Sequence, residues 1–303
     1  MALTVSTNLS SMIVQRNLNA ATNSLDKAIE RMSTGYRINH AGDNAAGFSI
    51  ATDWKTKLGS IDVASQNAAM GLDMLTTAEE NYALLTSHIQ RVRDLTEQAA
   101  NGTYGSVSLV AIRAEIQARL DEVDRIASGT EYNGVSLMSG SGTELKLQVG
   151  ITSDSNISQI TLDADMFKGA SSITLIKKSD GSAASDNKEI AKECTGVSID
   201  NAGVTTYTAA NNKATAMLAK IDAALTEISA RVTKLGSAQN KVESAISSLD
   251  TQSQNITSSL STLRDTDVAS ESSAYIQAQI LQQASATLLS TANQLPSVAL
   301  NLI

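Results

Sequence analysis

The side chains that most often carry catalysis or bind metals are few in this sequence and lie far apart. It contains two histidines, His40 and His88, and one cysteine, Cys194. Metal and nucleophilic sites need several such groups at fixed spacing, and neither histidine has a Cys, Asp or Glu at ligand spacing. A single cysteine also excludes an internal disulfide bond. These residues predict a protein that is not an enzyme and carries no metal and no cofactor.

Charge and glycine spacing exclude further classes of partner. The formal net charge is −8, and an acidic chain repels the phosphate backbone of nucleic acids. Gly134, Gly140 and Gly142 are not spaced as in a phosphate-binding loop and indicate turns instead. No stretch approaches the ~20 apolar residues of a membrane-spanning helix. Residues 1–30 lack the basic and apolar regions of a cleaved signal peptide, so export would need a dedicated machine.

The composition favours long helices, which must then position any functional residue. The chain has a single proline, Pro296, and proline is the residue that breaks helix interiors. Aromatic residues make up only 3% of it, so a thick core built on aromatic bulk is not expected. Slender seams between helices are the expected packing.

The strongest periodic signal is a heptad seam that runs from Leu218 to Leu263. Twelve of its fourteen positions are aliphatic, and only Gln239 and Ser253 interrupt it. This repeat predicts a coiled-coil helix roughly 70 Å long. A lone helix would leave the apolar stripe in water, so partner helices are required.

The N-terminal half supplies two partner helices. Apolar residues recur every seven positions and predict a helix over about 57–100, which ends at Asn101-Gly102. A second apolar repeat predicts a helix over about 107–128, and Gly129 follows as its stop signal.

Between these helical regions the apolar period changes to two. Leu145 and Leu147 alternate with polar residues and predict a half-buried strand, and residues 157–162 fit a return strand. Residues 168–212 are rich in Gly, Ser, Asp and Asn, which predicts a short exposed insertion. Cys194 lies in this insertion and is expected at the surface.

Weaker heptad seams lie at the two ends of the chain. Their residues are Leu18, Ala21, Leu25, Ala28 and Met32 near the N-terminus, and Ile276, Ile280, Ala284, Leu288, Thr291, Leu295, Val298 and Leu302 near the C-terminus. Such seams are marginal alone, so we expect the two ends to pair with each other and with other copies. The predicted fold is mainly α: an elongated rod of long coiled-coil helices with paired termini, a small β-hairpin region and a short exposed insertion.

Several blocks of the sequence resemble the bacterial flagellins. The matching blocks are residues 25–39, 41–47, 90–95, 98–103, 278–284 and 292–296. They occur in the family's order, and the resemblance covers about residues 1–165 and 213–303. Gly42 and Asn44 depart from it, because many relatives carry charged residues there. The short insertion makes the chain similar to a minimal flagellin.

The resemblance implies a structural subunit that self-assembles into the extracellular flagellar filament for motility. The subunit would be exported unfolded through the flagellar type III apparatus. Residues 1–43 and 255–303 would form a terminal coiled-coil domain (D0-like) in the inner tube. Residues 44–167 and 213–254 would form the surrounding helical domain with the β-hairpin (D1-like), and 168–212 the variable surface insertion.

The resemblance also implies partners. Many copies of the chain would form the filament, with the flagellar cap, junction proteins and an export chaperone as further partners. In the family, flagellins of the stimulatory type contact a host Toll-like receptor through residues that match Gln90, Arg91, Leu95 and Glu115. These residues should also lie in the contact between subunits along the filament.

Two alternatives share the terminal coiled coils. One is a hook–filament junction protein, and the other is a different type III-secreted coiled-coil protein. The N-terminal signature and the block around Asn101 favour a flagellin. Copy number discriminates among the three, since a flagellin dominates sheared surface filaments and the others are scarce.

Overall fold

The computed structural model describes the backbone of residues 8–139, 144–152, 154–176, 184–199, 205–207 and 210–300. The chain divides into two compact units, Met1–Gly59 with Gln252–Ile303, and Ser60–Thr251, and each is described by itself. Of the predicted seam residues, Leu302 and the side chains of Leu295 and Val298 lie outside the described part. The predicted mainly helical fold is confirmed.

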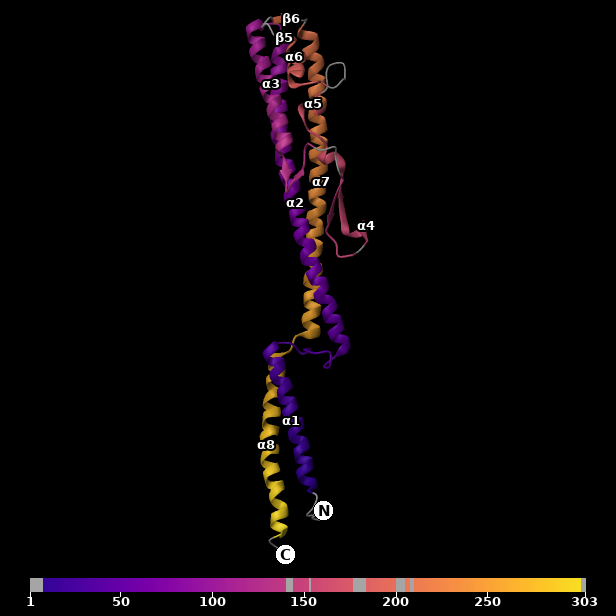
Figure 1. The fold of residues 1–303 in the computed structure, drawn as a ribbon, viewed down its shortest axis with the longest axis vertical. Helices are drawn as coiled ribbons and strands as arrows, with labels where there is room; N and C mark the ends of the chain where they lie inside the picture. Colours follow the sequence, from indigo (N-terminus) through magenta and orange to yellow (C-terminus); the bar gives the residue numbers. More distant parts are fainter. Residues whose placement is uncertain are drawn as a thin grey trace. The chain divides into compact units, whose positions relative to one another are not determined.

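The first unit is built on helices α1 (Leu9–Thr34) and α8 (Val268–Leu300), which lie side by side (Figure 1). Local signals fix the bounds of α1. The Asn8 side chain accepts a hydrogen bond from the Ser11 amide at 3.1 Å and caps the first turn. Gly35 ends the helix in the left-handed region, at φ 74°, where its amide donates to the Arg31 carbonyl. The predicted pairing of the two chain ends is confirmed.

The connections that leave these two helices are joined to each other. The Thr266 amide donates to the Gly35 carbonyl at 2.9 Å, and the Arg37 amide donates to the Arg264 carbonyl at 2.6 Å. The Arg264 guanidinium lies 4.2 Å from the centre of the Tyr36 ring, within cation–π range. These contacts hold the start of the α1–α2 connection against the α7–α8 connection.

The second unit is built on helices α2 (Ala45–Ala100), α3 (Ser106–Gly129) and α7 (Ala210–Arg264). All three correspond to predicted helices, and the predicted end of α2 at Asn101 is confirmed. The helix α2 begins a dozen residues earlier than the heptad pattern indicated. The Asn44 side chain accepts a hydrogen bond from the Gly47 amide at 2.9 Å and caps this extra length.

The core of the second unit is a narrow apolar seam between these helices. Its largest fully buried side chains on α2 and α3 are Tyr82, Leu75, Leu85, Ile89, Leu95, Ile116 and Leu120. The residues Ile221, Ile228, Leu235 and Val242 of α7, all on the predicted seam, are buried in the same cluster. Replacing one such leucine by alanine removes about 2–5 kcal/mol of stability.

Besides a strand pair within residues 168–212, two hairpins extend this unit. Strand β3 (Leu145–Gln148) pairs antiparallel with β4 (Gln159–Leu162), as the alternating pattern predicted. A short helix, α4 (Ser155–Ser158), lies between them. The other hairpin pairs β1 (Glu131–Tyr132) with β2 (Val135–Ser136).

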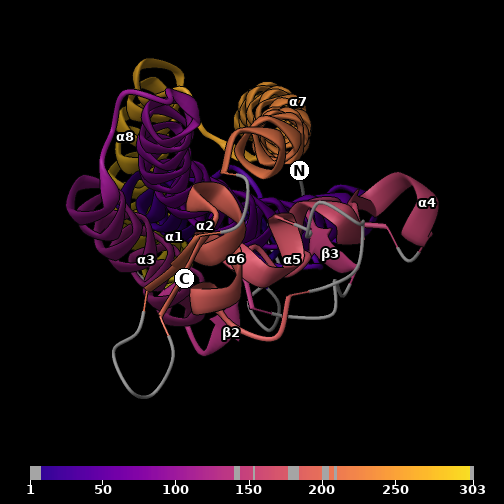
Figure 2. The same ribbon diagram turned by 90° about the horizontal axis from the view of Figure 1, so that it is seen from above.

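The segment predicted as an exposed insertion is partly packed against the helices. It contains α5 (Ser172–Leu175), α6 (Asn187–Thr195) and the paired strands β5 (Val197–Ile199) and β6 (Thr205–Tyr207), and a 3₁₀ turn, η1 (Ala164–Phe167), precedes it. Both α5 and α6 contact α3, and Figure 2 shows α6 beside it.

The expectation that Cys194 is exposed is wrong. Its exposed fraction is 0%, because α6 is a short amphipathic helix whose buried face contains Ile190, Ala191 and Cys194. Burial raises the pKa of the thiol to about 12. The missed signal is the helix start at Asp186, whose side chain accepts from the Glu189 amide at 2.8 Å.

Candidate assembly and contact surfaces

The helix α8 has two seams, and the structure separates them. The seam that faces α1 is made mostly of small and polar residues, with Tyr275 and Leu289 as its large side chains. Its half-buried or buried members are Glu271, Tyr275, Ala278, Gln282, Ser285, Leu289 and Ala292. The seam predicted from the sequence points outward, since Ile276, Ile280 and Leu288 are 53%, 60% and 56% exposed. The exposed side chains of Ile276, Ile280 and Leu288 are therefore not used by the pairing with α1.

Polar contacts support the inner seam where apolar ones are few. The Asn8 side-chain amide donates to the Ala292 carbonyl at 2.7 Å, and the Ser11 hydroxyl donates to the Asn293 side chain at 2.7 Å. Arg31 and Glu271 approach to 3.8 Å. Hydrogen bonds between neutral groups contribute about 1 kcal/mol each. Among the described residues of α1 and α8, the buried apolar ones are four alanines, Ala21, Ala28, Ala278 and Ala292, and the larger side chains of the seam are only half-buried.

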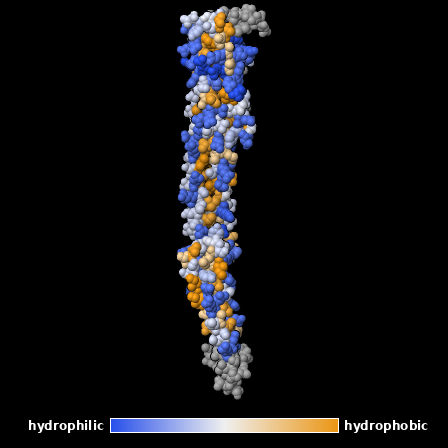
Figure 3. Space-filling model, turned by 90° about the vertical axis from the view of Figure 1, so that its left-hand side faces the viewer, coloured by the Kyte–Doolittle hydropathy of each residue, from blue (hydrophilic) through white to orange (hydrophobic). Residues whose placement is uncertain are grey.

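The helix α1 shows the same division. Leu18 and Leu25 are half-buried against α8, together with the buried Ala21 and Ala28. Other large apolar side chains of α1 are exposed: Leu9, Met12, Ile13, Ile29 and Met32. Figure 3 shows hydrophobic residues among hydrophilic ones on one face of the molecule. Apolar surface this extensive marks an interaction site in a water-exposed protein.

Three of the four predicted receptor-contact residues share one surface of the second unit. Gln90 and Arg91 are exposed on α2, and the Arg91 Nε atom lies 3.0 Å from Glu115 Oε1 on α3. Leu95 lies elsewhere. It is 2% exposed and belongs to the apolar core between the helices.

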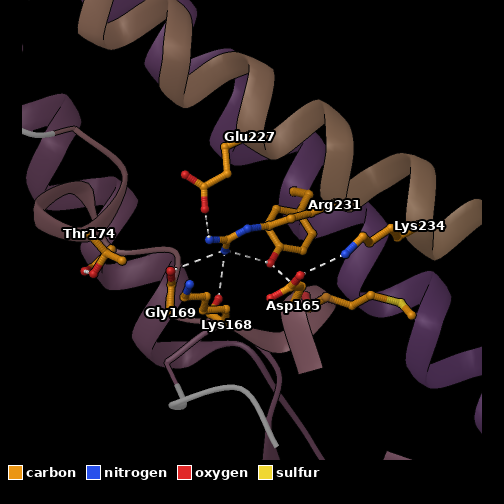
Figure 4. Close-up of polar contacts among 10 residues, drawn as sticks. Asp165, Lys168, Gly169, Thr174, Glu227, Arg231 and Lys234 are labelled. Atoms are coloured by element: carbon orange, nitrogen blue, oxygen red, sulfur yellow. Dashed lines mark hydrogen bonds and ion pairs between the residues drawn. The ribbon is translucent and has the colours of Figure 1, made fainter. Parts of the chain in front are cut away.

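Sequence reasoning missed a buried arginine, Arg231 on α7, which is 3% exposed (Figure 4). Its guanidinium donates to the Lys168 carbonyl at 2.8 Å and to the Gly169 carbonyl at 3.3 Å. It also pairs with Glu227 at 2.6 Å. The position gave no signal, because an arginine beside a coiled-coil seam is ordinarily solvated.

Tyr82 completes this contact from α2. Its hydroxyl donates to the Met166 carbonyl at 2.9 Å and lies 3.4 Å from Arg231 Nη1. Burial raises the pKa of the Tyr82 phenol, and the neighbouring Arg231 partly opposes that rise. The phenol therefore stays neutral and able to donate. Together Tyr82 and Arg231 fasten residues 166–169 to α2 and α7.

An exposed lysine reinforces the same attachment. Lys234 Nζ lies 2.9 Å from Asp165 (Figure 4). The same atom lies 3.0 Å from Asp163. These hydrogen bonds raise the pKa of Lys234, and the bond from Lys234 lowers the pKa of Asp163. Solvent screens pairs this exposed, so they orient the segment more than they stabilise it.

The two histidines belong to different units of the chain. His40 lies in the first unit with its Nε2 atom 2.8 Å from Glu30, and both side chains are exposed. His88 lies on α2 in the second unit. Among the described residues, no group of three or more His, Cys, Asp or Glu could hold a metal ion. No helix in that part of the chain is long and apolar enough to cross a membrane.

Comparisons with known proteins, which together cover the whole chain, all point to the same family. Residues 5–143 match the family model of the bacterial flagellin N-terminal helical region, and residues 218–303 match that of the C-terminal helical region. The chain is 30% identical to polar flagellin F of Vibrio parahaemolyticus and 31% identical to flagellin B of Vibrio anguillarum, in each case over all of both chains.

A solved structure adds a likeness in fold. A flagellar hook-associated protein from Vibrio parahaemolyticus aligns with a TM-score of 0.58 over 74% of this chain and all of that one. Its sequence identity is 12%, so it shows a shared helical architecture alone.

Proposed function

Because the chain belongs to the bacterial flagellins and is a structural subunit of the extracellular flagellar filament, we propose that its outward apolar seams join neighbouring copies. The filament contains many copies of one chain, and flagellins are not enzymes. The chain therefore has to offer surfaces that stay exposed in one subunit and become covered in the assembly.

The observation that carries this proposal is the pair of seams on α8. Ile276, Ile280 and Leu288 are larger and more apolar than most of the residues that face α1, yet they remain in water. Each such side chain contributes about 1.5–3 kcal/mol when it is fully buried. Neighbouring copies packed against this face would supply that burial, and the Met and Ile side chains exposed on α1 would add to it.

The two units fit two layers of a filament. We assign residues 1–43 and 255–303 to the inner tube and residues 44–167 and 213–254 to the layer around it, with 168–212 as a small addition. The compact units, which divide at Gly59 and Gln252, support a division of this kind. Parts of 168–212 pack on α3, so this addition is attached along the helices of the outer layer.

The weak α1–α8 pairing also suits export in an unfolded state. A pair held by small residues and a few polar contacts opens more readily than the aliphatic core of the second unit. Export through the flagellar type III apparatus with a chaperone, and placement beneath the filament cap, would then be followed by folding against neighbouring copies.

Substitution of the outward seam tests the proposal. The double variant Ile276→Gln and Ile280→Gln should remain a helical monomer, because both side chains are exposed in the single subunit. It should fail to elongate filament seeds, as followed by electron microscopy and by sedimentation. The variant Gln283→Ser changes an exposed polar position of α8 and is the matched control. Normal elongation by the double variant would refute the assignment of this face.

A second proposal concerns the host receptor. The adjacent, exposed Gln90, Arg91 and Glu115 form a polar surface on α2 and α3 that matches the positions used by stimulatory flagellins. We propose that monomers engage the flagellin-sensing Toll-like receptor through this surface. Leu95 would act from beneath it, by holding α2 in place.

A further inference from the structure

Two Asn-Gly pairs occur in this sequence, and the structure holds them in different conformations. Asn101-Gly102 follows the end of α2, and Asn133-Gly134 forms the turn between β1 and β2. All four residues are exposed, so exposure does not distinguish the two pairs. We propose that Asn101 is a site of spontaneous deamidation and that Asn133 is protected from the same reaction by its turn.

The reaction needs only the chain and water. The Gly102 amide nitrogen attacks Asn101 Cγ, the N–Cγ bond forms, and the Cγ–Nδ2 bond breaks. The side-chain nitrogen leaves as ammonia with the proton of the Gly102 amide, and a succinimide ring remains. Water then opens the ring at Cγ to give aspartate, or at the main-chain carbonyl to give isoaspartate. Glycine favours the attack, because it has no Cβ to crowd the incoming nitrogen.

The turn at Asn101 directs the reacting groups toward each other. The Asn101 Oδ1 atom accepts a hydrogen bond from the Thr103 amide at 3.3 Å, so the side-chain carbonyl folds back over the Gly102 peptide. This bond also withdraws electrons from the carbonyl and makes Cγ more electrophilic. The neighbouring main-chain contact is long, with the Tyr104 amide 3.4 Å from the Asn101 carbonyl. The short connection up to Gly105 can therefore move into the geometry of ring closure at little cost.

The other pair is held by a hydrogen-bonded hairpin. Asn133 and Gly134 have φ of 50° and 78°, the left-handed values of a two-residue type I′ turn. Tyr132 pairs with Val135 on either side of the turn. The ladder continues through the bond from the Leu137 amide to the Thr130 carbonyl at 3.0 Å, and Leu137 is fully buried. Ring closure at Asn133 requires this turn to open first.

Deamidation at Asn101 would change the charge at a helix end. Ala100 is the last residue of α2, so the new carboxylate stands at the negative end of that helix. The isoaspartate product also adds one methylene to the main chain between α2 and α3. Each modified subunit would carry an extra negative charge at the tip of the α2–α3 hairpin.

Peptide mapping separates the two sites. Trypsin cleaves after arginine and lysine, which places Asn101 in the peptide 94–113 and Asn133 in the peptide 126–146. The full chain is incubated in mildly alkaline buffer, digested at intervals and analysed by mass spectrometry. In the folded protein, deamidation of 126–146 should be at least about tenfold slower than that of 94–113, the ratio that a turn-opening cost of ~1.4 kcal/mol produces. In denaturant the two rates should become similar.

A single substitution gives the control. The Gly102→Ala variant should slow deamidation at Asn101, since a methyl group now hinders the attacking nitrogen, and should leave the rate at Asn133 unchanged. Equal rates at the two sites in the folded wild-type chain would overturn the proposal. A rate difference that persists in denaturant would overturn it as well, because the hairpin could not then be its cause.

Discussion

Arg231 illustrates how much one buried side chain can control. Its guanidinium donates to two main-chain carbonyls, those of Lys168 and Gly169, and it is itself paired with Glu227. A buried polar group without a partner costs more than a good hydrogen bond contributes. Arg231, Tyr82 and the carbonyls they bind therefore act as one unit.

Replacement of this arginine should loosen the segment it holds. We expect Arg231→Met to lower the free energy of unfolding by about 1–3 kcal/mol, because methionine fills the space of the stem and leaves the Lys168 and Gly169 carbonyls without their donor. Urea denaturation followed by circular dichroism measures this loss. Lys241→Met removes an exposed cation from the same helix and should cost much less. Equal losses from the two variants would show that the buried contact adds nothing.

Substitutions at the proposed receptor surface should distinguish a residue that contacts the receptor from one that only supports the surface. Arg91→Ala should weaken receptor activation by the monomer and leave stability nearly unchanged, because the Arg91 side chain is exposed and its ion pair is screened. Leu95→Ala should weaken activation as well, but with a loss of about 2–5 kcal/mol in stability, because Leu95 is buried. A cell-based reporter assay and urea denaturation supply the two readouts.

Arg125→Ala is the control for the receptor prediction. This arginine is also exposed and pairs within its own helix, with Glu122 at 2.5 Å. If Arg91→Ala and Arg125→Ala activate the receptor equally well, Arg91 does not have in this chain the receptor-contact role that the family resemblance implies.

At the scale of the elements, the β3–β4 hairpin depends on a close approach to α2. A Cβ atom added at Gly71 would lie 2.5 Å from Leu147 Cδ1, so Leu147 packs directly on the glycine backbone. The hairpin carries its apolar residues on one face, and this contact decides where that face meets the helix. A second glycine of α2, Gly59, has open space around its Cα.

The two glycines form a matched pair for substitution. Gly59→Ala should stabilise the chain by about 0.5–1 kcal/mol through helix propensity alone. Gly71→Ala gains the same propensity but displaces Leu147, and overpacking of this kind costs about 1–3 kcal/mol. In thermal unfolding, the melting temperature of Gly71→Ala should therefore be clearly lower than that of Gly59→Ala. Equal melting temperatures would mean that the hairpin is not anchored at Gly71.

At the scale of the whole molecule, the ends and the middle of the chain differ in how they are stabilised. The second unit has a continuous aliphatic core, whereas α1 and α8 meet mostly through small and polar residues with a few leucines, and leave other large apolar residues exposed. Removal of residues 1–30 or 275–303 should therefore leave a soluble helical monomer that cannot form filaments. Circular dichroism checks that the truncated monomer is helical, and electron microscopy after seeding checks that it forms no filaments. Normal filaments from either truncation would contradict the assignment of the ends to the inner tube.

The sequence by itself determined the long helices of this protein, most of their approximate ends and the β3–β4 hairpin, because periods of 3.5 and 2 report which positions are apolar along one element. Tertiary structure alone decided which of two seams on α8 meets α1. The face that meets α1 contains Ala278 and Ser285, whereas the more aliphatic face with Ile276 and Ile280 stays exposed, so the apolar pattern of α8 alone does not show which face pairs. It also decided the burial of Cys194, Leu95 and Arg231, since each depends on partners from distant segments.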